Sequence, residues 1–97
     1  MDAQTHEVKL PSGKIAVLRD SLTGEDFRVL RGIAVEGKTV RERMDNTENK
    51  LFELVVVSLD GSSENVLQRA LAGSAGDFGV LSDAASDVRY GRFTKAA

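Results

Sequence analysis

The N-terminal fold is decided by the stretch Val8-Lys9-Leu10-Pro11-Ser12-Gly13-Lys14-Ile15-Ala16-Val17-Leu18. Apolar and polar residues alternate on both sides of the Pro-Ser-Gly-Lys segment. Proline presets φ for the first turn position, and glycine reaches a positive φ without steric cost. The pattern predicts a β-hairpin over about residues 7–19, with a bent loop as the alternative. Because a lone hairpin is only marginally stable, we expect its apolar face to pack on the rest of the chain, through Val8, Leu10, Ile15 and Val17.

Two segments beyond the hairpin begin with helix-capping signals. The hydroxyl of Thr23 precedes the carboxylate of Asp26 by three positions, and Thr39 precedes Glu42 in the same way. The first signal predicts a helix over Glu25–Val35, which Gly37 ends. The second opens a stripe at the helical spacing of three and four residues, made of Val40, Met44, Thr47, Leu51, Leu54, Val55 and Ser58.

This second helical segment has two open alternatives. Asp45-Asn46-Thr47 contains poor helix formers and could divide the helix. The β-branched run in residues 51–57 could instead be a buried strand. We favour a continuous helix, because the stripe runs on from Val40 and Asp60-Gly61-Ser62 marks a helix end.

The C-terminal part of the sequence predicts two more helices separated by a flexible linker. The helices are expected at about Ser63–Ala72 and Phe78–Tyr90, and Gly91 ends the second. Glycine, serine and alanine dominate residues 73–79, which we interpret as a hinge. The expected fold is therefore α+β and mostly helical, with a hairpin followed by about four α-helices in one small domain of residues 1–97. Its helical body covers about 24–90, and 91–97 is expected to be a mobile tail.

Composition narrows the class of function. The 97 residues carry 13 Lys and Arg against 15 Asp and Glu, and acidic residues interleave with the basic ones between residues 28 and 43. A net charge of −2 argues against a nucleic-acid ligand. The chain has no cysteine, its first residues resemble no signal peptide, and its longest apolar run, Leu54–Val57, is far too short for a membrane. We expect a soluble protein of a reducing cytosol.

Residues with catalytic or metal-binding chemistry are few. His6 is the single histidine, and it lies in a polar segment ahead of any predicted element. Asp77, Asp83 and Asp87 are most simply a solvated acidic face, and the glycines at 73, 76 and 79 do not follow a predicted strand as a dinucleotide fingerprint requires. Asp77-Phe78-Gly79 matches a kinase tripeptide without the other kinase motifs. We therefore expect no enzyme activity, no cofactor and no metal.

The apolar segment around residues 51–57 is the candidate partner surface. A helix needs only one stripe to pack in its own domain, which leaves Phe52, Val56 and Leu59 on another side. The predicted partner-binding residues are Leu51, Phe52, Val56, Leu59, Phe78 and Leu81. An ordinary core helix and an identical subunit remain alternatives for what covers them.

One part of the chain resembles a known family. Leu10-Pro11-Ser12-Gly13-Lys14, the strand that follows it, Leu22-Thr23-Gly24-Glu25-Asp26 and Leu30 are similar to the N-terminal part of tail assembly chaperones of tailed bacteriophages. The resemblance covers about residues 7–35, and its main motif is the hairpin turn of Pro11, Ser12, Gly13 and Lys14. Beyond Val35 the chain shares only size and helical character with that family.

The resemblance implies a function in the host cell cytoplasm. Members of this family bind the aggregation-prone tape measure protein and help the tail tube protein to polymerise around it. They are free of cofactors and do not catalyse a reaction, and many of their genes also yield a longer product by frameshifting. The alternative is a small structural virion protein of the tail, the baseplate or the head decoration.

Overall fold

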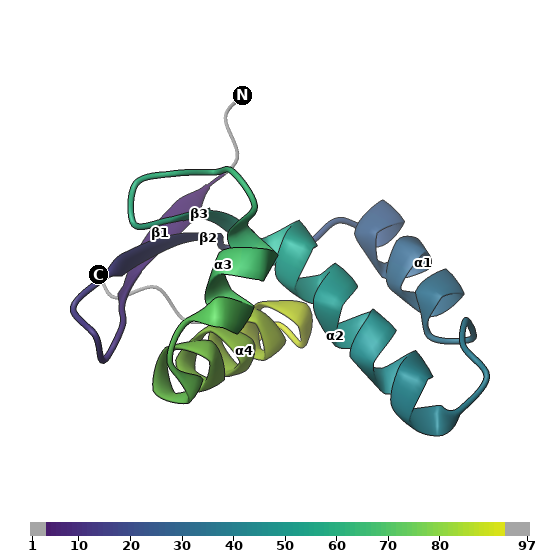
Figure 1. Cartoon of the computed structure of the whole chain (residues 1–97). Coiled ribbons are helices and arrows are strands. Elements are labelled where there is room, and N and C mark those ends of the chain that lie inside the picture. The colour runs from purple at the N-terminus through teal and green to yellow at the C-terminus, as the bar shows by residue number, and fades with distance from the viewer. Residues whose placement is uncertain (1–3, 93–97) are drawn as a thin grey trace.

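Three antiparallel strands and four helices make up residues 4–92, the part of the chain that the computed structural model describes (Figure 1). The strands are β1 (Thr5–Lys9), β2 (Ile15–Arg19) and β3 (Val56–Leu59), and β2 lies in the middle of the sheet. The helices are α1 (Gly24–Ile33), α2 (Val40–Val55), α3 (Val66–Ala72) and α4 (Ala75–Arg89). The predicted α+β fold, mostly helical with an N-terminal hairpin, is confirmed.

The hairpin turn forms at the predicted residues. Gly13 has a φ of 95°, its N–H donates to Leu10 O at 2.9 Å, and Leu10 N–H donates to Lys14 O at 2.8 Å. A three-residue loop that ends on a left-handed glycine is typical of a type I turn with a β-bulge. Strand β1 starts at Thr5, two residues before the predicted hairpin, so His6 lies in a strand and not ahead of the first element.

The apolar face predicted for the hairpin is wrong for its second strand. The three-residue loop pairs Val8 with Ala16 and Lys9 with Ile15, so the two partners in each pair share a face. Leu18 is consequently 0% exposed, whereas Ile15 is 37% exposed. Placing Ile15 and Val17 on the same face as Val8 assumes a register that is shifted by one residue from the observed one. Because neighbouring residues of a strand point to opposite faces, this shift exchanges the two faces.

The prediction that residues 51–57 are helical is right up to Val55 and wrong beyond it. At Val56 the chain leaves α2 and enters β3 directly, and Val56 pairs with Leu18 of β2. The strand places Val56 and Leu59 in the core and completes the sheet on the second side of β2. Helix α2 is not divided at Asp45–Thr47.

The segment Asp60-Gly61-Ser62 forms a tight turn after β3 and does not end a helix. Asp60 and Gly61 both have positive φ, 53° and 83°, and Leu59 and Ser62 exchange two backbone hydrogen bonds of 2.9 and 3.1 Å. Two positive φ values in a two-residue turn are typical of a type I′ hairpin, for which Asp-Gly is a preferred sequence. Arg69 of α3 then donates to the carbonyl oxygens of Leu59, Ser62 and Glu64, which anchors α3 to this turn.

Both predicted helix caps are present. Thr23 Oγ1 accepts from Asp26 N–H at 3.1 Å while Asp26 accepts from Thr23 N–H at 2.8 Å. Thr39 Oγ1 accepts from Glu42 N–H at 3.1 Å. These bonds satisfy N–H groups that a helix start leaves without backbone partners. Helix α1 ends at Ile33, two residues before the predicted end.

The predicted hinge over residues 73–79 is wrong. Helix α4 starts at Ala75, where Ser74 Oγ accepts from Asp77 N–H at 3.1 Å, and so Gly76 and Gly79 are helical. Only Gly73 and Ser74 join α3 to α4. Helix α3 is shorter than predicted, because it begins at Val66. Of the predicted mobile tail, Gly91 and Arg92 make backbone hydrogen bonds to α4, and 93–97 lie outside the described residues.

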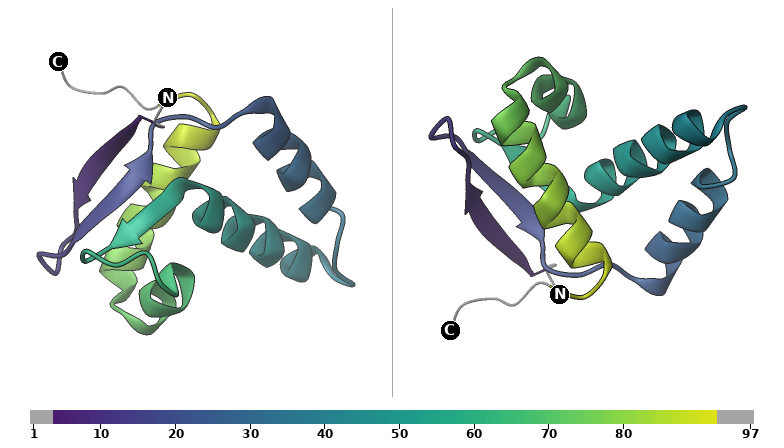
Figure 2. Two further views of the ribbon diagram at one scale, coloured as in Figure 1. Left: turned by 90° about the horizontal axis from the view of Figure 1, so that it is seen from above. Right: turned by 90° about the horizontal axis from the view of Figure 1, so that it is seen from below.

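One core joins the sheet to the helices. Helix α4 crosses one face of the sheet, while α1 and α2 project together to one side of it (Figure 2). Arg19 of β2 links the two parts, because it donates to Leu54 O of α2 at 3.3 Å and to Asp26 of α1 at 3.1 Å. The buried apolar residues are Leu10, Ala16, Leu18, Leu30, Leu51, Phe52, Val55, Val56, Leu59, Leu67, Ala70, Leu81, Ala85 and Val88.

Candidate protein-binding groove

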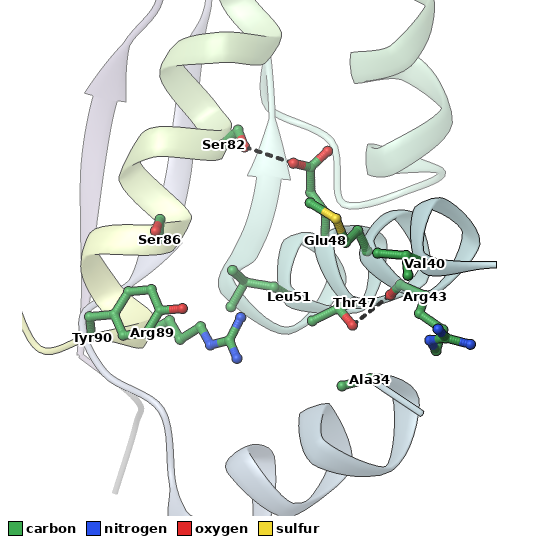
Figure 3. Close-up of a pocket in the computed structure, with 11 residues that line it drawn as sticks. Ala34, Val40, Arg43, Thr47, Glu48, Leu51, Ser82, Ser86, Arg89 and Tyr90 are labelled. Atoms are coloured by element: carbon green, nitrogen blue, oxygen red, sulfur yellow. Dashed lines mark hydrogen bonds between the residues drawn. The ribbon is translucent and has the colours of Figure 1, made fainter. Parts of the chain in front are cut away.

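An open groove lies among α1, α2 and α4. Helix α2 packs against both of the other helices, and α1 and α4 make no comparable packing with each other. The resulting hollow has a volume of about 400 Å³ (Figure 3). Its lining residues come from α2, from α4 and from the residues that follow α1 and α4: Ala34, Val40, Arg43, Met44, Thr47, Glu48, Leu51, Ser82, Ser86, Arg89 and Tyr90.

The groove exposes large apolar side chains. Val40 and Met44, on the first two turns of α2, are 64% and 66% exposed, and Tyr90 at the end of α4 is 58% exposed. Leaving one large apolar side chain in water forgoes roughly 1.5–3 kcal/mol. What sets these three apart from the other exposed apolar side chains is that they surround one hollow.

Polar contacts fix the sides of the groove. Ser82 of α4 donates to Glu48 of α2 at 3.5 Å, and Thr47 Oγ1 donates to Arg43 O of its own helix at 2.8 Å (Figure 3). Arg43 also donates to Gly37 O at 3.0 Å, which connects α2 to the loop before it. The hydroxyl of Thr47 is thus satisfied within the helix, so its methyl group is left for the groove.

Arg89 extends from α4 into the space between Leu51 and Ala34 (Figure 3). Its guanidinium carbon lies 5.0 Å from the centroid of the Tyr90 ring, and that of Arg92 lies 5.1 Å from the same ring. A cation at this distance from an aromatic face is attracted by the ring quadrupole. The aromatic side of the groove is therefore also its most basic side.

A second hollow adjoins the first. It has a volume of about 460 Å³ and is lined by Ser21, Leu22, Phe27, Val88, Arg89, Tyr90 and Gly91. Arg89 and Tyr90 line both hollows.

The predicted partner-binding residues lie elsewhere. Phe52, Val56, Leu59 and Leu81 are buried in the core, and the Phe52 ring stacks on Phe78 with centroids 5.8 Å apart. Of the six predicted residues, only Leu51 lines the groove, and it is itself buried. The expectation that Phe52, Val56 and Leu59 face away from their own domain is wrong, because all three are buried in its core.

Three of the groove residues, Val40, Met44 and Thr47, belong to the apolar stripe that the sequence predicts for this helix. The sequence did not single them out as partner-binding residues. Only the C-terminal part of α2 reaches the sheet and α4, so the first turns of the stripe stay exposed. The stripe was a valid signal of an apolar face, although it did not indicate which end would be covered.

The hairpin turn has a structural partner on α4. Ser12 N–H donates to Asp77 Oδ1 at 3.0 Å, and Ser12 Oγ donates to Asp77 Oδ2 at 2.5 Å. The Ser12 hydroxyl holds the pKa of the Asp77 carboxyl below its usual value; burial opposes this effect, and Lys14 adds to it. Pro11 also lies beside α4, since a Cβ added at Gly76 would be 3.9 Å from its ring. The turn of Pro11, Ser12, Gly13 and Lys14 thus docks on the first turn of α4.

Within residues 4–92, no three His, Cys, Asp or Glu side chains come together in a group that could hold a metal ion. His6 Nδ1 lies 2.7 Å from Asp20 Oδ1, and this pair lies away from the residues that line the groove. In the described part of the chain, no helix combines the length and the apolar character that crossing a membrane requires.

Comparisons of the chain with protein-family models, with curated proteins and with solved structures found no match.

Proposed function

We propose that this chain is a tail assembly chaperone of a tailed bacteriophage, which binds the tape measure protein in the host cytoplasm without catalysis and assists polymerisation of the tail tube protein. The observation that carries this proposal is the open groove among α1, α2 and α4, with Val40, Met44 and Tyr90 exposed around it. An amphipathic helix that lies in an apolar groove is a common mode of protein recognition.

The chemistry of the groove suits a client that must later be released. Its apolar contacts come from aliphatic side chains, a methionine and a single tyrosine, which lie on α2 and directly after α1 and α4. Methionine adapts to varied partner surfaces because its side chain is unbranched and polarizable. Many modest contacts of this kind give reversible binding more readily than a few deeply buried anchors.

The resemblance in residues 7–35 supports the proposal by a second route. In this chain the Pro-Ser-Gly-Lys turn docks on Asp77, so its role here is to position α4. Helix α4 in turn supplies one side of the groove. The similar residues therefore support the scaffold on which the groove is built.

The test is co-expression of the tagged chain with the tape measure protein of the same phage. We expect the wild type to keep that protein soluble and to co-purify with it. Met44→Glu places a charge in the groove and should abolish capture. Leu71→Glu is the matched control, because Leu71 is also exposed, at 58%, but lies on α3 and outside the groove.

Capture that is unaffected by Met44→Glu, or no capture by the wild type, would contradict the proposal. Mass spectrometry of purified phage particles separates it from the alternative. A chaperone is absent from the particles, whereas a structural protein of the tail, baseplate or head is present in them in fixed stoichiometry.

A further inference from the structure

Arg89 has a buried donor that lacks an acceptor. Its Nε atom is inaccessible to solvent and has no hydrogen-bond partner among the described residues, and its guanidinium forms no ion pair with them. A buried donor without an acceptor is destabilising, and the cost is greater when the group is charged. The free domain therefore holds a cation whose hydrogen bonding is incomplete.

No carboxylate that lines the groove completes the hydrogen bonding of Arg89. Glu48 is the one carboxylate among the lining residues, and it accepts from Ser82 on the opposite side of the hollow. The other charged lining residues are Arg43 and Arg89, so the lining carries two positive charges against one negative. An occupant with a carboxylate would complement the local charge, and a turn of the Arg89 side chain on binding would bring the unpaired Nε within its reach.

The geometry of arginine favours a specific contact. The guanidinium can hold a carboxylate through two parallel N–H···O bonds, and the side-on form of this pair uses Nε and one Nη. Arg89 and Tyr90 line both hollows, so a helix lying over both would pass Arg89. Such a helix would place apolar side chains on both sides of the ion pair.

We propose that Arg89 is the receptor for an Asp or Glu carboxylate on a helix of the partner protein. The partner helix is amphipathic, with apolar residues at i, i+3 or i+4, and i+7 that cover Val40, Met44 and Tyr90. Its acidic residue lies on the same face and turns the Arg89 guanidinium so that Nε and one Nη donate to the carboxylate. This inference rests on the proposed function only in requiring that the groove binds a partner helix.

The probe is a display library of random helical peptides of about 18 residues, or about five turns, selected on the purified chain. Counter-selection on Met44→Glu retains only peptides that bind in the groove. We expect these peptides to share one acidic position within the apolar pattern. Changing that residue to its amide should weaken binding about 10- to 100-fold, the usual effect of losing a hydrogen bond to a charged group.

A double-mutant cycle decides whether Arg89 is the receptor. Arg89→Gln should weaken binding of the acidic peptide by the same factor and should not weaken the amide peptide further. Arg41→Gln is the matched control, because Arg41 is exposed on α2 and does not line the groove. Circular dichroism and thermal unfolding establish that each variant folds.

Additive effects of the two changes would overturn the inference, as would groove binders without an acidic residue or a library that yields no groove binders. Self-association that depends on Arg89, measured by light scattering, would identify a second copy as the occupant and would equally overturn it. Failure of the proposed function can be told apart from failure of this inference. If the chain does not capture the tape measure protein but groove peptides still depend on Arg89, the inference holds and only the identity of the client is wrong.

Discussion

Ser12 and Asp77, 65 positions apart, are joined by two hydrogen bonds, from the backbone N–H and the hydroxyl of Ser12 to the two carboxylate oxygens of Asp77. Asp77 is 6% exposed and also lies in the capped first turn of α4, where a negative charge interacts favourably with the helix dipole. The pair therefore fixes the hairpin turn against the helix that forms one side of the groove.

The contribution of Asp77 to stability should depend on pH. Its pKa in the folded protein lies below the usual value, chiefly because the Ser12 hydroxyl donates to it, so folding favours the ionised form. The stabilisation is present above the pKa of the unfolded chain and is lost as the pH falls through the folded pKa. Urea unfolding should show wild type more stable than Asp77→Asn at pH 7, and the difference should shrink below about pH 4. Asp83→Asn, an exposed change on α4, should show no comparable loss; equal behaviour of the two variants would contradict the prediction.

The two faces of β2 should differ sharply in their tolerance of substitution. Leu18→Ala removes a fully buried side chain and should lower the free energy of unfolding by about 2–5 kcal/mol. Ile15 lies three residues earlier, on the partly exposed face, so Ile15→Ala should lower the free energy of unfolding by much less. Chemical denaturation measures both. A larger loss for Ile15 than for Leu18 would mean that the strand pairs in the other register.

Substitutions of Phe52 in the core and of Met44 in the groove should affect stability differently. Phe52 is 1% exposed and stacks on Phe78, so Phe52→Ala should destabilise the fold by about 3–5 kcal/mol. Met44→Ala should change stability by less than about 0.5 kcal/mol, because Met44 is 66% exposed. Calorimetric unfolding of both variants makes the comparison. Near-native stability of Phe52→Ala would restore the earlier interpretation of Phe52 as a partner-binding residue.

Gly79 tests whether residues 73–79 form a hinge, and Gly61 tests the turn after β3. Gly79 lies inside α4 and an added Cβ would meet no atom within 4 Å, so Gly79→Ala should stabilise the protein by about 0.5–1 kcal/mol. Gly61 has a φ of 83°, and Gly61→Ala should destabilise it by about 1–2 kcal/mol. Thermal unfolding gives the sign of each change. A loss of stability in Gly79→Ala would indicate that this residue is not helical.

Features that depend on neighbouring residues were determined by the sequence itself. The Pro-Ser-Gly-Lys turn, the caps at Thr23 and Thr39 and the helix ends near Gly37 and Gly91 all follow from φ preferences and from hydrogen bonds between residues a few positions apart. These signals were sufficient for the α+β class and for the order of most elements. They act within one or two turns, and so they can be read without knowing what packs against them.

Tertiary structure alone decided the path of residues 56–59, the inward face of β2 and the position of the groove. Val56 and Val57 suit either a helix or a strand, and pairing with β2 selected the strand. The stripe that begins at Val40 is apolar from end to end, yet the sheet and α4 cover only its later turns. Whether a side chain is buried depends on which distant segment of the chain packs against it. For that reason Met44, Arg89 and Tyr90 became groove residues and Phe52 became core only when the elements were assembled.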